Sequence, residues 1–179
     1  MSNTALLVMD VQEAVVARYP DPDYLPRLAT AVEAARSAGL PVIFVVVGFR
    51  PGAPEVSTAN RMFGGLAGRD SPAPEAHPAV ARRDREALVV KRRVSAFAGS
   101  DLDMLLRAQR IEHLVLTGIA TSGVVLSTLR QAADLDYRLT VLNDGCLDND
   151  EAVHEVLTEK VFPSQAEVVT VAEWIKKVG

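Results

Sequence analysis

Two oppositely charged side chains stand at the ends of apolar runs that are typical of buried strands. Asp10 ends the run ALLVMD (5 to 10) and Lys91 ends the run ALVVK (87 to 91). Ligands of open α/β sheets bind at the carboxyl ends of the strands, so we expect both side chains in one cleft. Burial raises the pKa of a carboxyl group and a neighbouring cation lowers it. The pair can therefore hold a proton donor or acceptor in place, and a purely structural ion pair at the sheet edge is the alternative.

The turn GIATSG (118 to 123) links a strand-like run to a helical pattern and is the second candidate for chemistry. Free N–H groups at the start of a helix, together with the helix dipole, favour negative charge. Thr121 or Ser122 is expected to cap this helix. Ser122 has no histidine next to it in the sequence that would act as a base, so capping is favoured over nucleophilic attack.

The remaining reactive side chains give weaker signals. Cys146 is the only cysteine and is interpreted as a small buried filler near a strand end. The histidines lack the spacing of metal ligands, so no metal and no cofactor is expected. His113 is expected to begin a strand, and His154 to lie within a helix that is capped from the run Asp148, Asn149 and Asp150. Arginines that face the cleft would bind a carboxylate by bidentate pairing; the candidates are Arg50, Arg61, Arg82, Arg83 and Arg92.

Strand-like and helical segments alternate along the chain. Strands are expected at 5–10, 41–49, 87–91, 113–119, 138–144 and 166–171, and helices at 24–39, 101–110, 122–136, 150–161 and 171–178. Gly39 stands where a glycine ends a helix. Several strands are apolar on both faces, which is typical of parallel strands covered by helices on both sides. The sequence therefore predicts an α/β fold, a three-layer α/β/α sandwich around a mostly parallel sheet of about six strands.

Residues 48–86 interrupt this alternation with a long stretch rich in Gly, Pro and Arg. Irregular segments of this length within a compact domain are usually functional or disordered. This one returns directly into a core strand, and we interpret it as a loop that covers the site. Residues 1–179 are expected to form one domain around it, because a chain of 179 residues suits a single α/β core.

Composition excludes some classes of function. The formal net charge of −4 argues against a general nucleic-acid binder, whose footprint would be a basic face. The opening residues show no basic leader followed by an apolar run. The longest apolar stretch, around 40–49, is roughly half of the ~20 residues that a membrane helix needs. A soluble, cytoplasmic protein with a small-molecule substrate and no membrane partner is the expectation.

Several of these motifs, in this order, resemble those of the isochorismatase-like hydrolases, a family that includes nicotinamidases and N-carbamoylsarcosine amidases. They are LLVMDVQ with Asp10, and the long run from VVKRRVSAF with Lys91 through LTGIATSGVV to LNDGCLD. The resemblance covers nearly the whole chain and implies the isochorismatase-like, Rossmann-like fold and a homo-oligomer. It also implies a catalytic Asp, Lys and Cys, with a cis peptide bond before the nucleophile turn. Asp10 and Lys91 match the first two, the cis bond would join Ile119 to Ala120, and the cysteine position falls on Gly123.

A glycine in place of the thiol implies that the family's covalent route to amide hydrolysis is closed. The isochorismatases proper need no nucleophile: their Asp protonates a vinyl ether, water adds, and pyruvate is released. The resemblance thus implies Asp10 as the acid and Lys91 as the group that orients it. The substrate-binding residues expected from it are Gln12, Arg61, Ile119, Ala120, Thr121 and Ser122. Hydrolysis of another substrate by water that Asp10 and Lys91 activate, or a descendant that only binds a metabolite or a protein, are the alternatives.

Overall fold

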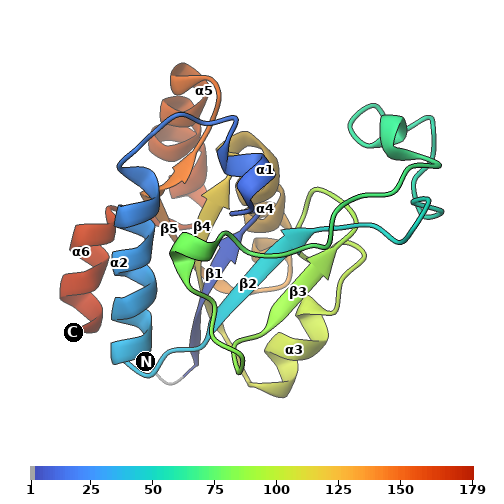
Figure 1. Cartoon of the computed structure of the whole chain (residues 1–179). Helices are drawn as coiled ribbons and strands as arrows, with labels where there is room; N and C mark the ends of the chain where they lie inside the picture. The colour runs from blue at the N-terminus through green and yellow to red at the C-terminus, as the bar shows by residue number, and fades with distance from the viewer. Residues whose placement is uncertain (1–2) are drawn as a thin grey trace.

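A computed structural model describes residues 3–179, which fold around one six-stranded parallel sheet (Figure 1). Its strand order is β3-β2-β1-β4-β5-β6. The strands are β1 (Thr4–Met9), β2 (Val42–Val47), β3 (Leu88–Lys91), β4 (His113–Ile119), β5 (Arg138–Leu147) and β6 (Glu167–Val169). All six expected strands are present and the predicted α/β fold class is confirmed.

Helices cover both faces of the sheet and bury two apolar layers. One layer packs α3 (Leu102–Ala108), α4 (Leu126–Asp134) and the chain after α5 (Glu151–Val156) against one face. The other packs α2 (Tyr24–Ser37) and α6 (Val171–Val178) against the opposite face, and these two helices lie side by side in Figure 1. The central strand β1 is buried over its whole length, which explains why its sequence is apolar without alternation.

The ends of the helices follow the local sequence. After α2 the chain turns at Gly39, whose φ of +68° lies in the left-handed region that glycine favours. Asp150 caps α5 by accepting from the N–H groups of Ala152 and Val153, as the sequence predicts for this run. One helix was not predicted: α1 (Glu13–Val16) is a single turn and gives no periodic apolar pattern.

Strand β5 is longer than predicted because its pairing with β4 is interrupted. Leu116 pairs with Val141, but Gly118 pairs with Cys146, so β5 bulges between the two registers. The bulge carries the chain past the predicted end at residue 144 and lets pairing resume next to the turn at 118–123. The irregularity therefore lies beside a candidate functional turn.

The segment between β2 and β3 has only two short 3₁₀ turns, η1 (Gly64–Leu66) and η2 (Pro78–Val80). Its first part, residues 49–75, is called the arm here and projects away from the sheet in Figure 1. Asp70 Oδ1 accepts from the N–H of Gly52, and the carbonyl of Gly52 accepts from the N–H of Gly68. These contacts close a loop over residues 52–70 within the arm. Among the helices of residues 3–179, none is both long and apolar enough to cross a membrane.

Gly118 fixes the close approach of β4 to β1, and replacing it should destabilise the fold. Its φ is +144°, and a Cβ there would lie 2.2 Å from the carbonyl oxygen of Met9, which precedes Asp10. We expect Gly118→Ala to lower the free energy of unfolding by about 3 kcal/mol or more, because backbone atoms must move. Chemical denaturation measures this loss. Gly65→Ala is the control: a Cβ there meets nothing within 4 Å, so a change within about 0.5 kcal/mol is expected. Equal stability of both variants would contradict the close approach.

Candidate active site

Asp10 and Lys91 form a buried ion pair across the end of β2. Asp10 directly follows β1 and adopts a left-handed φ of 55°, a conformation that Asp tolerates better than most residues. Lys91 is the last residue of β3. Its Nζ lies 2.9 Å from Asp10 Oδ2, although β2 separates the two strands. The expected meeting of these side chains at one edge of the sheet is confirmed.

Burial decides the protonation of Asp10. Only 8% of the residue is exposed, and this burial raises the pKa of its carboxyl group from 3.8 to about 6, although the charge and hydrogen bond of Lys91 act in the opposite direction. Oδ1 of Asp10 is buried and has no hydrogen-bond partner among the described residues. The carboxyl group can therefore exchange a proton near neutral pH, and one of its oxygens accepts no hydrogen bond from the described residues.

The loop after β3 holds Lys91 in place. Its Nζ donates to the carbonyl of Arg93 at 2.9 Å. Farther along, the N–H of Ala96 donates to Oγ1 of Thr128 on α4 at 2.9 Å, and Ser95 Oγ donates to Oε1 of Gln131 on the same helix at 2.7 Å. The serine and alanine of the SAF run thus attach this loop to α4, the helix that follows the candidate turn.

The turn after β4 has an unusual backbone. The Ile119–Ala120 bond is cis, as the family resemblance implies. It leads into η3 (Thr121–Val125), a π-helical turn in which Gly123 adopts φ −98° and ψ −105°, outside the helical region. α4 continues from it, so the single helix predicted over 122–136 begins with a distorted turn.

The predicted cap of this helix is wrong. Ala120 occupies the N-cap position, and no side chain caps it. Oγ1 of Thr121 instead lies 2.8 Å from Nδ1 of His154 on α5, while the N–H of Ser122 donates to Asp148 Oδ2 at 2.7 Å. The N–H of Ser122, which was predicted to be free, thus donates to a carboxylate from the β5–α5 connection. Tertiary contacts replace the local cap.

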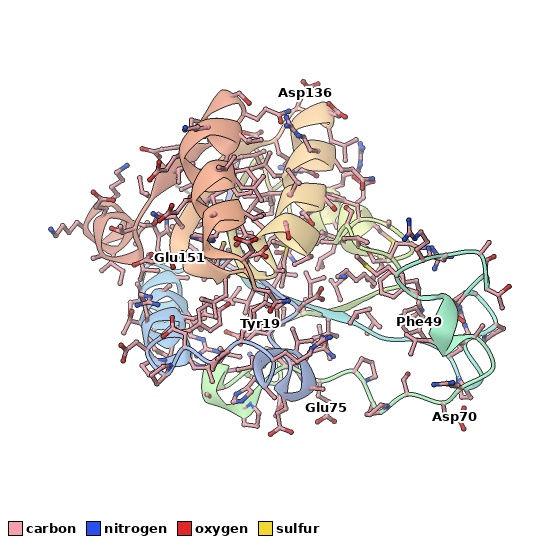
Figure 2. The ribbon with its side chains drawn as sticks, turned by 90° about the horizontal axis from the view of Figure 1, so that it is seen from above. Tyr19, Phe49, Asp70, Glu75, Asp136 and Glu151 are labelled. Carbon is pink, nitrogen blue, oxygen red and sulfur yellow. The ribbon has the colours of Figure 1, made fainter. Side chains whose placement is uncertain are left out.

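A cavity of about 440 Å³ opens beside the ion pair. Viewed from above in Figure 2, Tyr19 lies close to α1 and Phe49 at the root of the arm, and both line this cavity. Apart from the charged residues Asp10, Lys91 and Arg18, its walls are largely apolar and are formed by Val15, Tyr19, Val47, Phe49, Met62, Phe63, Leu66, Val94, Ile119, Ala120, Gly123 and Val124. Among these lining residues there is no Cys, Ser, Thr or His side chain.

The structure brings part of the predicted site together. Asp10, Lys91, Ile119, Ala120 and Gly123 line the cavity, and Gln12, Arg61, Thr121 and Ser122 do not.

The residues outside the cavity have other surroundings. The side-chain amide of Gln12 accepts from the N–H of Val47 and donates to its carbonyl, which joins the exits of β1 and β2. Arg61 is exposed on the arm. Of the arginines considered from the sequence, none lines this cavity.

Sequence reasoning missed Arg18, Tyr19, Phe49 and Val124. Phe49 carried a usable signal, because it follows β2 at the edge where Asp10 and Lys91 were sought. Arg18 and Tyr19 follow the unpredicted helix α1, and no periodic pattern indicates where they point. The Tyr19 hydroxyl remains a proton donor, because burial and the charge of Asp148 raise its pKa. Val124 is the neighbour of Gly123 and is buried in the cavity wall.

The only thiol is not available for chemistry here. Cys146 is 1% exposed on β5 and does not line the cavity. Burial raises its pKa to about 12, so it carries no thiolate near neutral pH. The interpretation of Cys146 as a buried filler is consistent with this placement.

Fold and site together define a class: a parallel α/β domain with a cavity at the carboxyl ends of its strands, where a buried acid–lysine pair meets a strand-to-helix turn. The chain belongs to the isochorismatase family, since the Isochorismatase domain matches residues 4–173. It is 30% identical over 177 residues to the isochorismatase family protein YwoC of Bacillus subtilis, covering 98% of this chain and 94% of that protein.

Two further relatives extend the comparison. Ureidoacrylate amidohydrolase RutB of Stutzerimonas stutzeri is 34% identical over 172 residues, which cover 80% of this chain and 69% of that protein. The structure of an isochorismatase family protein from Burkholderia thailandensis superposes with a TM-score of 0.91 at 28% identity, covering 99% of this chain and 96% of that one. The predicted isochorismatase-like fold is confirmed.

The titration of Asp10 tests the electrostatics of the site. With ¹³C-labelled aspartate, its carboxyl carbon should titrate with a midpoint at about pH 6. In Lys91→Met the midpoint should rise further, because the attraction that lowers the pKa is removed while burial remains. Lys177→Met removes a half-exposed lysine paired with Glu167 and should leave the midpoint unchanged. A midpoint near 3.8 in the parent would show that water solvates the carboxyl group.

Proposed function

We propose that this chain is a cysteine-independent hydrolase of the isochorismatase type that acts on a small carboxylated metabolite, with vinyl-ether hydrolysis as the favoured reaction. The observation that carries the proposal is the state of Asp10. Its carboxyl group lines the cavity, has a pKa raised to about 6, and has one oxygen without a protein partner. A carboxylic acid of that pKa is suited to proton transfer near neutral pH.

In this reaction protonated Asp10 donates its proton to the terminal carbon of the enol ether. The electron pair of the carbon–carbon double bond forms the new C–H bond, and the ether oxygen shares the positive charge of the resulting oxocarbenium ion. Water adds to the carbon that is bonded to the ether oxygen and loses a proton, which gives a hemiketal. The hemiketal then breaks its bond to the alcohol oxygen, which takes up a proton, and pyruvate and the alcohol are released. Lys91, at 2.9 Å, stabilises the Asp10 carboxylate that the first step leaves behind.

The cavity wall supports a route without a covalent intermediate. Gly123, the position that we assign to the missing cysteine, has no side chain, and its neighbour Val124 presents only methyl groups. Neither position supplies a nucleophile, and Cys146 is buried elsewhere. The relative RutB is named for amide hydrolysis; a thioester route to that reaction is closed to this chain.

Arg18 is the best candidate for binding a substrate carboxylate. Two cations line the cavity: Lys91 is paired with Asp10, whereas Arg18 is exposed and forms no ion pair with any residue of the described chain. The rest of the cavity wall is largely apolar. It includes Phe49 and Phe63, whose rings are in edge-to-face contact with 5.5 Å between their centroids. A small molecule with an apolar body and an anionic group matches this lining.

Release of pyruvate from isochorismate is the direct test. We expect the parent to release pyruvate and Asp10→Asn to lose the activity by about 10²-fold or more, because an amide cannot donate the proton. Coupling to lactate dehydrogenase measures the product, and circular dichroism checks that the variant is folded. No release by the parent would remove this reaction, and release by both proteins would remove Asp10 as the acid.

The pH dependence separates this proposal from its alternative, activation of water by Asp10 as a base. A general acid must be protonated, so kcat/KM should be constant below about pH 6 and fall about tenfold per unit above it. A general base must be ionised, so kcat/KM would rise through the same pH. A rising profile would therefore favour the alternative.

The role of Arg18 predicts a change in KM. Arg18→Gln should raise KM for an anionic substrate about tenfold while kcat changes little, because one charge-assisted hydrogen bond away from the reacting carbon is lost. Arg61→Gln is the matched control and should leave KM unchanged, because Arg61 does not line the cavity. A raised KM in Arg61→Gln with an unchanged KM in Arg18→Gln would instead assign carboxylate binding to Arg61, the residue expected from the sequence.

A further inference from the structure

A second cavity lies where the chain leaves β2 and β3, next to the candidate active site. It has a volume of about 430 Å³ and is lined by Arg50, Glu55, Arg92, Arg93 and Gly99. Neighbouring residues divide between the two cavities: Phe49 and Lys91 line the first, Arg50 and Arg92 the second. The two cavities therefore adjoin one another where the chain leaves these strands. We call the second one the arginine cavity.

Positive charge is in excess in the arginine cavity. Glu55 is its only carboxylate, and Oε1 of Glu55 lies 3.4 Å from Arg50 Nη1 and 3.0 Å from Arg92 Nε. Backbone hydrogen bonding lowers the pKa of Glu55, with Arg50 and Arg92 adding to the effect, so the group is ionised. Three guanidinium groups facing one carboxylate leave two positive charges without a counter-ion in the lining.

Arg93 is positioned but not neutralised. Its Nη1 donates to the carbonyl of Arg92 and its Nη2 to the carbonyl of Glu55, both at 2.7 Å, and it forms no ion pair with any described residue. Arg36 differs from Arg93, because its guanidinium group is paired with Glu86 at 2.7 Å and also with Glu33. These two ion pairs are sufficient to explain a structural role for Arg36. Carbonyl groups fix the guanidinium of Arg93 while its charge remains available.

Donors and one acceptor in the cavity lack partners. The three guanidinium groups make four hydrogen bonds to protein acceptors, although each carries five N–H groups. Within the described chain, Glu55 Oε2 is buried without a hydrogen-bond partner, and Arg92 Nε is buried in ion-pair contact with Glu55 Oε1 without forming a hydrogen bond. Gly99 allows Arg92 to lie here, since a Cβ at Gly99 would approach Arg92 Cβ to 2.8 Å. A ligand that completes this set accepts from several guanidinium groups and donates one hydrogen to Glu55.

We propose that the arginine cavity binds a monoprotonated phosphate group, free or on a small metabolite, independently of the candidate active site. Its tetrahedral oxygens accept from arginines that approach from different directions, and its remaining hydroxyl donates to Glu55 Oε2. A sulfate has the same shape but no hydroxyl near neutral pH, so its oxygen would face the Glu55 carboxylate without a hydrogen. The cavity therefore selects phosphate over sulfate.

Calorimetric titration of the full chain with inorganic phosphate, in a low-salt buffer near pH 7, tests this site. We expect saturable binding and weaker binding of sulfate. Arg93→Gln should weaken phosphate about tenfold or more. Arg50→Gln should weaken it in the same direction, and it keeps the fold testable because the Arg50 side chain is 64% exposed. Arg69→Gln, an exposed arginine of the arm outside the cavity, is the matched control and should bind phosphate as the parent does.

Two further variants locate the ligand. Glu55→Gln should reduce the preference for phosphate over sulfate, because the amide can donate to an oxyanion that has no hydroxyl. Asp10→Asn should leave phosphate binding unchanged, so this proposal and the proposed hydrolysis fail separately. Absence of saturable binding, equal weakening by Arg69→Gln, or loss in Arg18→Gln with Arg93→Gln unaffected would each overturn the assignment.

Discussion

The site depends on a carboxyl group and an ammonium group that are kept out of water together. Removing two such charges from water costs several kcal/mol per ion, and their attraction recovers this only with good geometry. Lys91 is 1% exposed and its Nζ contacts Asp10 and the carbonyl of Arg93. A well-packed apolar pair would serve stability as well or better. The placement of these charges beside a cavity therefore favours a chemical role over the structural alternative.

The surrounding elements act mainly to hold this pair at the sheet edge. The sheet order places β2 between β1 and β3, so the charged side chains meet over its end. Gln12 joins β1 to β2 through both backbone groups of Val47. The SAF loop ties the exit of β3 to α4, while Asp148 and His154 hold the turn that precedes α4. Each contact bridges segments that are distant in the sequence.

The sequence allowed the strands, the parallel arrangement and the Asp10–Lys91 meeting to be predicted, because these follow from apolar runs and from one rule about strand ends. It did not indicate Arg18 and Tyr19, which depend on a single-turn helix that has no period to detect. The cap at Thr121 or Ser122 was wrong because local propensity was overruled by contacts with His154 and Asp148. The expected homo-oligomer and the role of residues 48–86 as a cover stay predictions.

Because the cavity lining holds no Cys, Ser, Thr or His side chain, the function we propose rests on proton transfer rather than on covalent hydrolysis. Covalent hydrolysis needs a nucleophilic side chain such as a thiol, a group that activates it and a leaving group held in line. Proton transfer needs only an acid whose pKa lies near the working pH and a substrate carbon within reach. Asp10 meets the first of these conditions because burial outweighs Lys91, and the same attraction that lowers its pKa stabilises the anion once the proton has left. In the proposed reaction, Lys91 therefore lowers the fraction of protonated Asp10 before the proton transfer and stabilises the Asp10 carboxylate after it.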